Sequence, residues 1–178
     1  VYFRPISPAL SVVALVAGLF HIVNHVCYKS CLFLNVGAVE HRTGSRNLNV
    51  IGGLASVMPL TAIAAVVASM SISGMPFFSG FSSKWLIYHV SILGGRVSAF
   101  AVVFGLVALF ASIATLAACL QFLAAGFMGK LRTPDGDKCV REVSAGMTIP
   151  QMVLGVFCIL FGVAPIIAVR PAYQAVSD

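Results

Sequence analysis

Two histidines and a lysine recur at intervals of four residues in the first apolar stretch of the chain. They are His21, His25 and Lys29, and on an α-helix this spacing places all three on one face, about 6 Å apart along the axis. An imidazole ring accepts a proton on one nitrogen and donates from the other, and it titrates near neutral pH. Three titratable groups in one row, each within one or two waters of the next, predict a relay that moves protons.

A second lysine, Lys84, lies in another apolar stretch, ten residues before the turn Gly94-Gly95-Arg96. At about 1.5 Å per residue, it would lie roughly 15 Å below the surface of a bilayer, where a charge costs at least about 2.5–3.5 kcal/mol. The alternative is that Lys84 forms an interfacial belt with Trp85 and Tyr88. Its side chain spans only part of that depth, which favours a functional lysine.

Other chemistries fit these residues less well. His21 and His25 would supply two zinc ligands, but no carboxylate or paired cysteine stands at a suitable spacing to complete the set. A haem pair is disfavoured because axial histidines usually come from different helices, and His41 and His89 lie near opposite ends. A hydrolase would need an intramembrane carboxylate or a nucleophile elbow. We therefore expect no cofactor and no metal in this chain.

The composition indicates a membrane protein. Of the 178 residues, 60% are hydrophobic and 9% are charged, whereas roughly a quarter are charged in soluble domains. So few charges cannot cover the surface of a soluble globule. The net charge of +6 comes without the clustered basic and aromatic side chains of a nucleic-acid-binding protein, so no nucleic-acid partner is expected.

The elements that must hold these residues are long apolar helices. We expect a single all-α membrane domain over residues 1–178 with about four transmembrane helices. The apolar stretches run over about residues 9–39, 58–93, 98–128 and 148–169. Pro59 and Pro150 are expected in the first turns of their helices, and Arg170-Pro171 is expected to close the last one.

The second stretch is too long for one straight crossing and too short for two. Its middle contains Gly74, Pro76 and Gly80. Pro76 has no N–H to donate, which frees a carbonyl near Ile72, and the glycines let the chain unwind on either side. We therefore predict one discontinuous crossing, of the kind that forms ion sites in transporters. The alternative is a simple proline kink.

The basic residues predict an orientation. With four crossings, the first and third connections share one side of the membrane, and that side has the excess of Lys and Arg. The positive-inside rule then places these loops in the cytoplasm and both termini outside, in the plasma (inner) membrane of a prokaryote. The richer side carries Arg42, Arg46, Lys130, Arg132, Lys138 and Arg141, and the other side carries Arg4, Arg96 and Arg170.

Several of these motifs together resemble one known family. Leu19–Leu34 resembles the His-x-x-x-His-x-x-x-Lys helix of the antiporter-like subunits of complex I (NADH-quinone oxidoreductase), membrane-bound [NiFe] hydrogenase or formate hydrogenlyase, and Mrp-type cation/proton antiporters. Gly80–Lys84 resembles the family's second broken helix, whose Lys or Glu is a proposed proton-transfer site. The resemblance also covers Gly37–Val39, Thr43–Leu48, Gly52–Leu54, Met58–Thr61 and Ile72–Pro76.

The resemblance implies a fold of about fourteen helices, of which this chain matches the C-terminal four. It implies translocation of an ion, expected to be the proton, by a subunit of a redox-driven respiratory or hydrogenase complex with no redox centre in this chain. Lys84 would be the switching site, fed by Lys29, with His25 and His21 continuing the path. The expected partners are other membrane subunits, the lipid bilayer, and protons or sodium ions.

Three alternatives remain at this point. The chain could belong to an Mrp-type sodium/proton antiporter subunit. It could be a structural or assembly subunit whose buried polar residues only specify helix packing. It could also be an unrelated secondary transporter that holds a small substrate at the break over residues 74–80.

Overall fold

The computed structural model describes residues 8–96, 98–133 and 140–177. Within these residues the regular structure is helical, and an isolated β-bridge joins Gly52 to Arg132. The all-α prediction is therefore confirmed. In chain order the elements are α1 (Pro8–Thr43), η1 (Leu54–Ser56), α2 (Pro59–Ser73), α3 (Ser79–Gly94), α4 (Ala99–Phe127), α5 (Ala145–Val163) and α6 (Ile166–Ser177).

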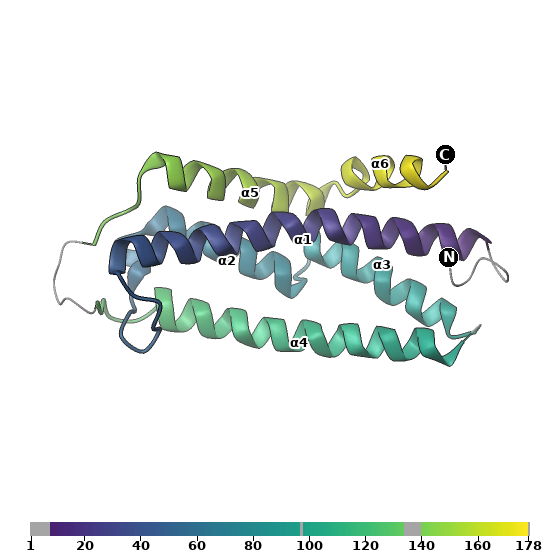
Figure 1. The fold of residues 1–178 in the computed structure, drawn as a ribbon, viewed down its shortest axis with the longest axis horizontal. Coiled ribbons are helices and arrows are strands. Elements are labelled where there is room, and N and C mark those ends of the chain that lie inside the picture. The colour runs from purple at the N-terminus through teal and green to yellow at the C-terminus, as the bar shows by residue number, and fades with distance from the viewer. Residues whose placement is uncertain (1–7, 97, 134–139, 178) are drawn as a thin grey trace.

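The helices form an elongated bundle organised around α1, which runs along its whole length (Figure 1). One side of α1 packs against α2, α3, α5 and α6, whereas α4 packs against α2 and α3. Among the described residues the backbones of α1 and α4 do not approach each other closely. The cavity described below is lined by residues of α1, α3 and α4, together with Ile72 of α2.

The buried side of α1 forms much of the core. Phe20, Tyr28 and Cys31 are almost completely buried, and they follow the three- and four-residue spacing of one helix face. Tyr28 and Cys31 pack with Ala68 of α2 and Cys158 of α5 in one cluster. The histidines and Lys29 follow a different face of the same helix, so the core fixes their direction.

The described helices fit the predicted arrangement of membrane helices, in which one crossing is discontinuous. Three helical stretches are long and apolar enough to span a membrane, namely Ala9–Thr43, Ala99–Phe127 and Ala145–Val163. The shorter apolar helix α2 continues into α3 after a non-helical segment at residues 74–78. α2 and α3 are placed end to end (Figure 1), as expected for one helix interrupted in its middle.

Gly80 does not lie where the sequence predicted it. Gly74 and Pro76 belong to the non-helical segment, whereas Gly80 lies in the first turn of α3. The reason is close packing, because a Cβ at Gly80 would overlap the carbonyl oxygen of Ser71. Gly80 is thus required for the approach of α3 to α2, and not for unwinding.

The last stretch also differs from the prediction. α5 begins at Ala145, so Pro150 lies inside the helix and not in its first turn. α5 ends at Val163 because Pro165 follows with no N–H to continue it. Arg170-Pro171 does not end the last helix, because α6 continues through Pro171 to Ser177.

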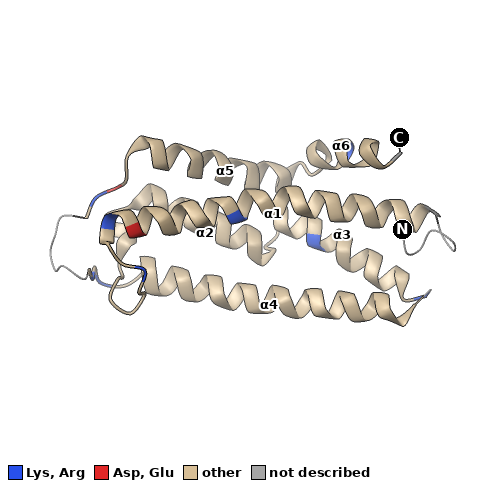
Figure 2. Ribbon diagram, in the orientation of Figure 1, with Lys and Arg blue, Asp and Glu red and all other residues tan. Residues whose placement is uncertain are grey.

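The described charges gather mainly at the two ends of the bundle, with two basic positions midway along it (Figure 2). The first and third connections meet at one end, where Gly52 and Arg132 exchange two backbone hydrogen bonds of 3.0 Å. Arg42 donates to the carbonyl oxygen of Glu142 there, at 2.6 Å. Arg4 and Lys138, which entered the predicted charge asymmetry, lie outside the described residues.

Candidate functional site

The break between α2 and α3 creates a free carbonyl. In a continuous helix the Ile72 oxygen would accept from the N–H of residue 76, but residue 76 is proline and has none. Gly74 ends α2 in the left-handed region, with φ 83°. Beyond the break, Lys84 on the second turn of α3 reaches the Ile72 oxygen with its Nζ at 2.7 Å.

Two glycines make this contact possible. A Cβ at Gly74 would lie 3.2 Å from Cδ of Lys84, so glycine leaves room for the lysine stem. At Gly80 even a methyl group would collide with the backbone of α2. The lysine ammonium therefore sits against a helix end that has an unpaired acceptor, which partly replaces the water that a buried cation loses.

The row predicted on α1 faces this lysine. The ring centroids of His21 and His25 lie 6.1 Å apart, and those of His25 and Tyr28 lie 5.3 Å apart. Nδ1 of His21 forms a hydrogen bond of 3.0 Å with the hydroxyl of Ser83, the residue before Lys84. The relay residues on α1 and the broken helix thus meet through a direct contact.

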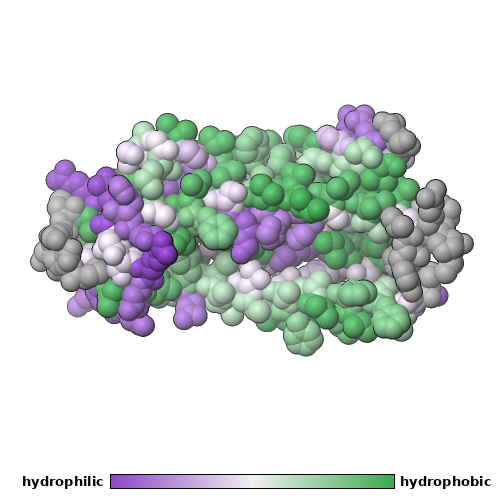
Figure 3. Space-filling model, viewed as in Figure 1, coloured by the Kyte–Doolittle hydropathy of each residue, from purple (hydrophilic) through white to green (hydrophobic). Residues whose placement is uncertain are grey.

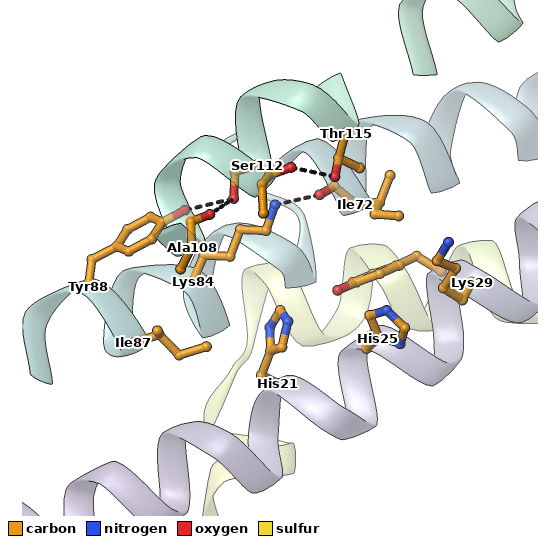
Figure 4. Close-up of a pocket in the computed structure, with 12 residues that line it drawn as sticks. His21, His25, Lys29, Ile72, Lys84, Ile87, Tyr88, Ala108, Ser112 and Thr115 are labelled. Carbon is orange, nitrogen blue, oxygen red and sulfur yellow. Dashed lines mark hydrogen bonds between the residues drawn. The ribbon is translucent and has the colours of Figure 1, made fainter. Parts of the chain in front are cut away.

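A cavity of about 280 Å³ connects the two groups. It lies over α3 between α1 and α4, and Figure 4 shows His21 and Lys84 on its opposite walls. A volume of this size holds several water molecules. Its lining consists of His21, His25, Tyr28, Lys29, Ile72, Lys84, Ile87, Tyr88, Ala108, Ala111, Ser112 and Thr115.

The hydroxyl groups on the α4 wall were missed by the sequence reasoning. Tyr88 and Ser112 share a hydrogen bond of 2.8 Å, and Ser112 and Thr115 also bond to carbonyl oxygens one turn back, at 2.9 and 2.6 Å. The three-residue spacing of Ser112 and Thr115 in a largely apolar helix was the available signal. Tyr88 lines the cavity together with Lys84.

The structure brings together all four predicted relay residues, Lys84, Lys29, His25 and His21, in the lining of this one cavity. Lys29 lies farther along α1 than the histidines, with its Nζ 5.8 Å from the centroid of the Phe33 ring. Among the described residues, no three His, Cys, Asp or Glu side chains lie close enough to hold a metal ion. The polar side chains that line the cavity are amines, imidazoles and hydroxyls, which can exchange protons with water.

A buried amide and two buried hydroxyls lie at the break as well. Nδ2 of Asn24 donates to the carbonyl oxygen of Ser79 at 3.2 Å, and the hydroxyls of Ser71 and Ser79 lie 2.9 Å apart. Asn24 and Ser79 are fully buried. These bonds tie α1, the end of α2 and the start of α3 together, so the free carbonyl and the histidine row keep their relative positions.

The bundle and its lysine-lined break define an antiporter-like fold of the kind found in ion-transport subunits. Residues 7–112 match the family described as "NADH:quinone oxidoreductase/Mrp antiporter, TM". This match covers more than half of the chain, and the chain belongs to this family.

The similar proteins are subunits of larger complexes. The chain is 34% identical over 186 residues to a Na(+)/H(+) antiporter subunit of Alkalihalophilus pseudofirmus, covering 99% of this chain and 23% of that protein. It is 30% identical to a Na(+)/H(+) antiporter subunit of Staphylococcus saprophyticus, with the same coverage. The chain therefore spans about a quarter of the length of these relatives.

Two solved structures share the fold. The Mrp complex from Dietzia sp. DQ12-45-1b matches with a TM-score of 0.79 and 26% identity, over 92% of this chain and 37% of that one. The membrane-bound sulfane sulfur reductase, an archaeal respiratory membrane complex, matches with a TM-score of 0.74 and 32% identity, over 84% of this chain and 24% of that one. An Mrp complex and an archaeal respiratory membrane complex thus both contain this arrangement of helices.

Proposed function

We propose that this chain forms an ion-translocating part of an Mrp-type sodium/proton antiporter subunit. The expectation of a redox-driven complex finds support at the level of the family and of one respiratory structure. The antiporter alternative has more support, since the similar relatives are named Na(+)/H(+) antiporter subunits and one matching structure is an Mrp complex. The partners are then the other membrane subunits of that complex.

The observation that carries the proposal is the placement of Lys84. Its Nζ donates to the carbonyl that Pro76 leaves free, at 2.7 Å, and it faces a cavity lined by His21, His25 and Lys29. An ammonium group held by one carbonyl keeps two N–H groups that can donate to water in the cavity. Loss of its proton to the cavity, and uptake of another, would move one charge across the break.

The histidines and Lys29 extend the path along α1. Each turn of the helix advances the row by about 6 Å, a gap that one water molecule bridges. Because each imidazole can accept on one nitrogen and donate from the other, a proton can pass along the row without rotation of the helix. In this role Lys84 is the switching site and Lys29 exchanges protons with the far end of the row.

Three substitutions at Lys84 test the proposal in membrane vesicles that contain the complete antiporter complex. Lys84→Met keeps the length and apolar contacts but cannot titrate, so assembly survives and sodium-driven proton movement is lost. Lys84→Arg keeps the charge but does not deprotonate at accessible pH, so it also fails. Lys84→Glu restores a titratable group and is expected to retain part of the activity.

A purely structural role predicts another order. If Lys84 only holds α3 to the Ile72 carbonyl, Arg preserves a donor and is tolerated, whereas Met and Glu remove it and reduce assembly. The amount of complex in the membrane, measured beside transport, separates the two. Full transport by a Lys84→Met complex would eliminate the relay.

A further inference from the structure

The outward face of α1 is apolar except at its middle. Ile22, Val26 and Phe33 are 60%, 56% and 71% exposed, as expected for side chains that face lipid. Between them, His25 is exposed and Lys29 is half-buried. Figure 3 shows a hydrophilic patch halfway along an otherwise largely hydrophobic face, and Figure 2 shows the basic position on α1 at that level.

The polar side chains of this patch cannot face the hydrocarbon of the bilayer directly. Lys29 is twelve residues from His41 at the polar end of the helix, so it lies about 18 Å below that end. A lysine side chain is too short to bring its ammonium to the headgroups from such a depth. Ionisable groups inside a membrane face protein or water and are paired with other groups.

None of the described residues provides that pairing. Within the part of the chain that the structure describes, Lys29 makes no hydrogen bond or ion pair, and its Nζ lies over the ring of Phe33. The sequence has no Asp or Glu before Glu40 and none between Glu40 and Asp135. Glu40 already pairs with Arg46 at 2.8 Å, and Glu142 accepts from the first turn of α2. The lining of the cavity therefore collects basic groups with no counter-charge among them.

We propose that a transmembrane helix from outside this chain covers this face of α1 and presents an Asp or Glu side chain to Lys29. A carboxylate is favoured over a neutral polar group because two lysines and two histidines line the cavity without any acid. The same helix would cover His25, one turn away, and would close the open side of the cavity. This inference requires that α1 spans the membrane, and it does not depend on the proposed ion transport.

The first test identifies the covering helix by photocrosslinking in the complete complex. Phe33 lies one turn from Lys29 and is 71% exposed, and Phe110 on α4 is also 71% exposed, so it is a matched control. Benzoylphenylalanine placed at Phe33 should attach to a protein helix with Asp or Glu within one turn of the attached residue. The Phe110 position should show its own, different adducts. If Phe33 crosslinks only to lipid, or to a helix without a carboxylate there, the proposal is wrong.

The second test exchanges the charges. In the benzoylphenylalanine background, Lys29→Glu places a second acid beside the proposed carboxylate, and the two repel each other. The crosslink yield from Phe33 should then fall about threefold or more, as expected from the strength of polar contacts between membrane helices. Replacing the identified carboxylate by lysine in the same background should restore the yield. Unchanged yield in Lys29→Glu, or no recovery in the exchanged pair, would overturn the pairing. Because yield and not transport is measured, an inactive relay does not affect the result.

Discussion

Gly80→Ala is the substitution that most directly tests how the break holds Lys84. A Cβ at this position would overlap the carbonyl oxygen of Ser71, which belongs to the last turn of α2 and cannot rotate away. Overpacking of this kind costs about 1–3 kcal/mol. To relieve it, α3 must move away from α2.

The matched control is Gly37→Ala on α1, where an added Cβ meets no atom within 4 Å. Alanine gains about 0.5–1 kcal/mol over glycine in a helix. To a first approximation both variants share that gain, so the difference between them isolates the clash. Gly37→Ala should leave the thermal midpoint of the complex unchanged or slightly raised, and Gly80→Ala should lower it.

The functional consequence follows from the length of one bond. Lys84 lies one turn after Gly80, and its Nζ is 2.7 Å from the Ile72 oxygen. A displacement of α3 by about 1 Å would stretch this contact beyond the length of a hydrogen bond. Sodium-driven proton movement in everted vesicles should therefore fall in Gly80→Ala and persist in Gly37→Ala. Equal stability and equal transport in the two variants would refute the reasoning.

Two further predictions concern the basic end of the bundle and the orientation. The carboxylate of Glu142 caps α2, because it accepts from the N–H of Leu60 at 2.8 Å and from the hydroxyl of Thr61 at 2.6 Å. Glu142→Ala removes this cap, which is worth about 0.5–2 kcal/mol, and should lower the thermal midpoint of the complex. Glu142→Gln keeps an acceptor and should lower the midpoint less, and equal effects of the two variants would contradict the capping role. The orientation can be tested with single cysteines in a Cys139→Ser background. An impermeant maleimide should label Arg96→Cys but not Asn47→Cys in intact cells, and it should label both variants after permeabilisation. Labelling of Asn47→Cys but not Arg96→Cys in intact cells would show that the predicted orientation is inverted.

The local parts of the site could be predicted from the sequence. The common face of His21, His25 and Lys29 follows from the helical repeat alone. The free carbonyl at Ile72 follows from the proline four residues later, because the missing N–H is a property of the chain and not of its packing. The same logic predicted an interrupted helix, and the structure has one between α2 and α3.

The remaining parts depend on how distant elements approach one another. Ser112 and Thr115 line the cavity because α4 packs on α3 in one particular register, which no local pattern specifies. Gly80 looked like an unwinding residue because glycine allows both open turns and close contacts, and only the position of Ser71 decides between them. Pro150 lies inside α5 since the preceding residues continue the helix before it.

The contact between His21 and Ser83 leads to a last prediction about the direction of the relay. Nδ1 of His21 bonds to the Ser83 hydroxyl at 3.0 Å, so Nε2 is the ring nitrogen left to exchange a proton with the cavity. Ser83→Ala leaves Nδ1 without this partner and lets the ring turn.

A net hydrogen bond contributes about 1 kcal/mol, so loss of the oriented ring should reduce transport by about fivefold with assembly unchanged. Ser82→Ala is the control, because that hydroxyl instead contacts the carbonyl oxygen of Gly162 at 3.5 Å. The two variants differ by one position in the sequence and remove the same atom, so a general effect on α3 would reduce both alike. Ser83→Cys restores a weak hydrogen-bonding group and should recover part of the loss. Equal transport in Ser82→Ala and Ser83→Ala would show that the orientation of His21 does not limit proton transfer.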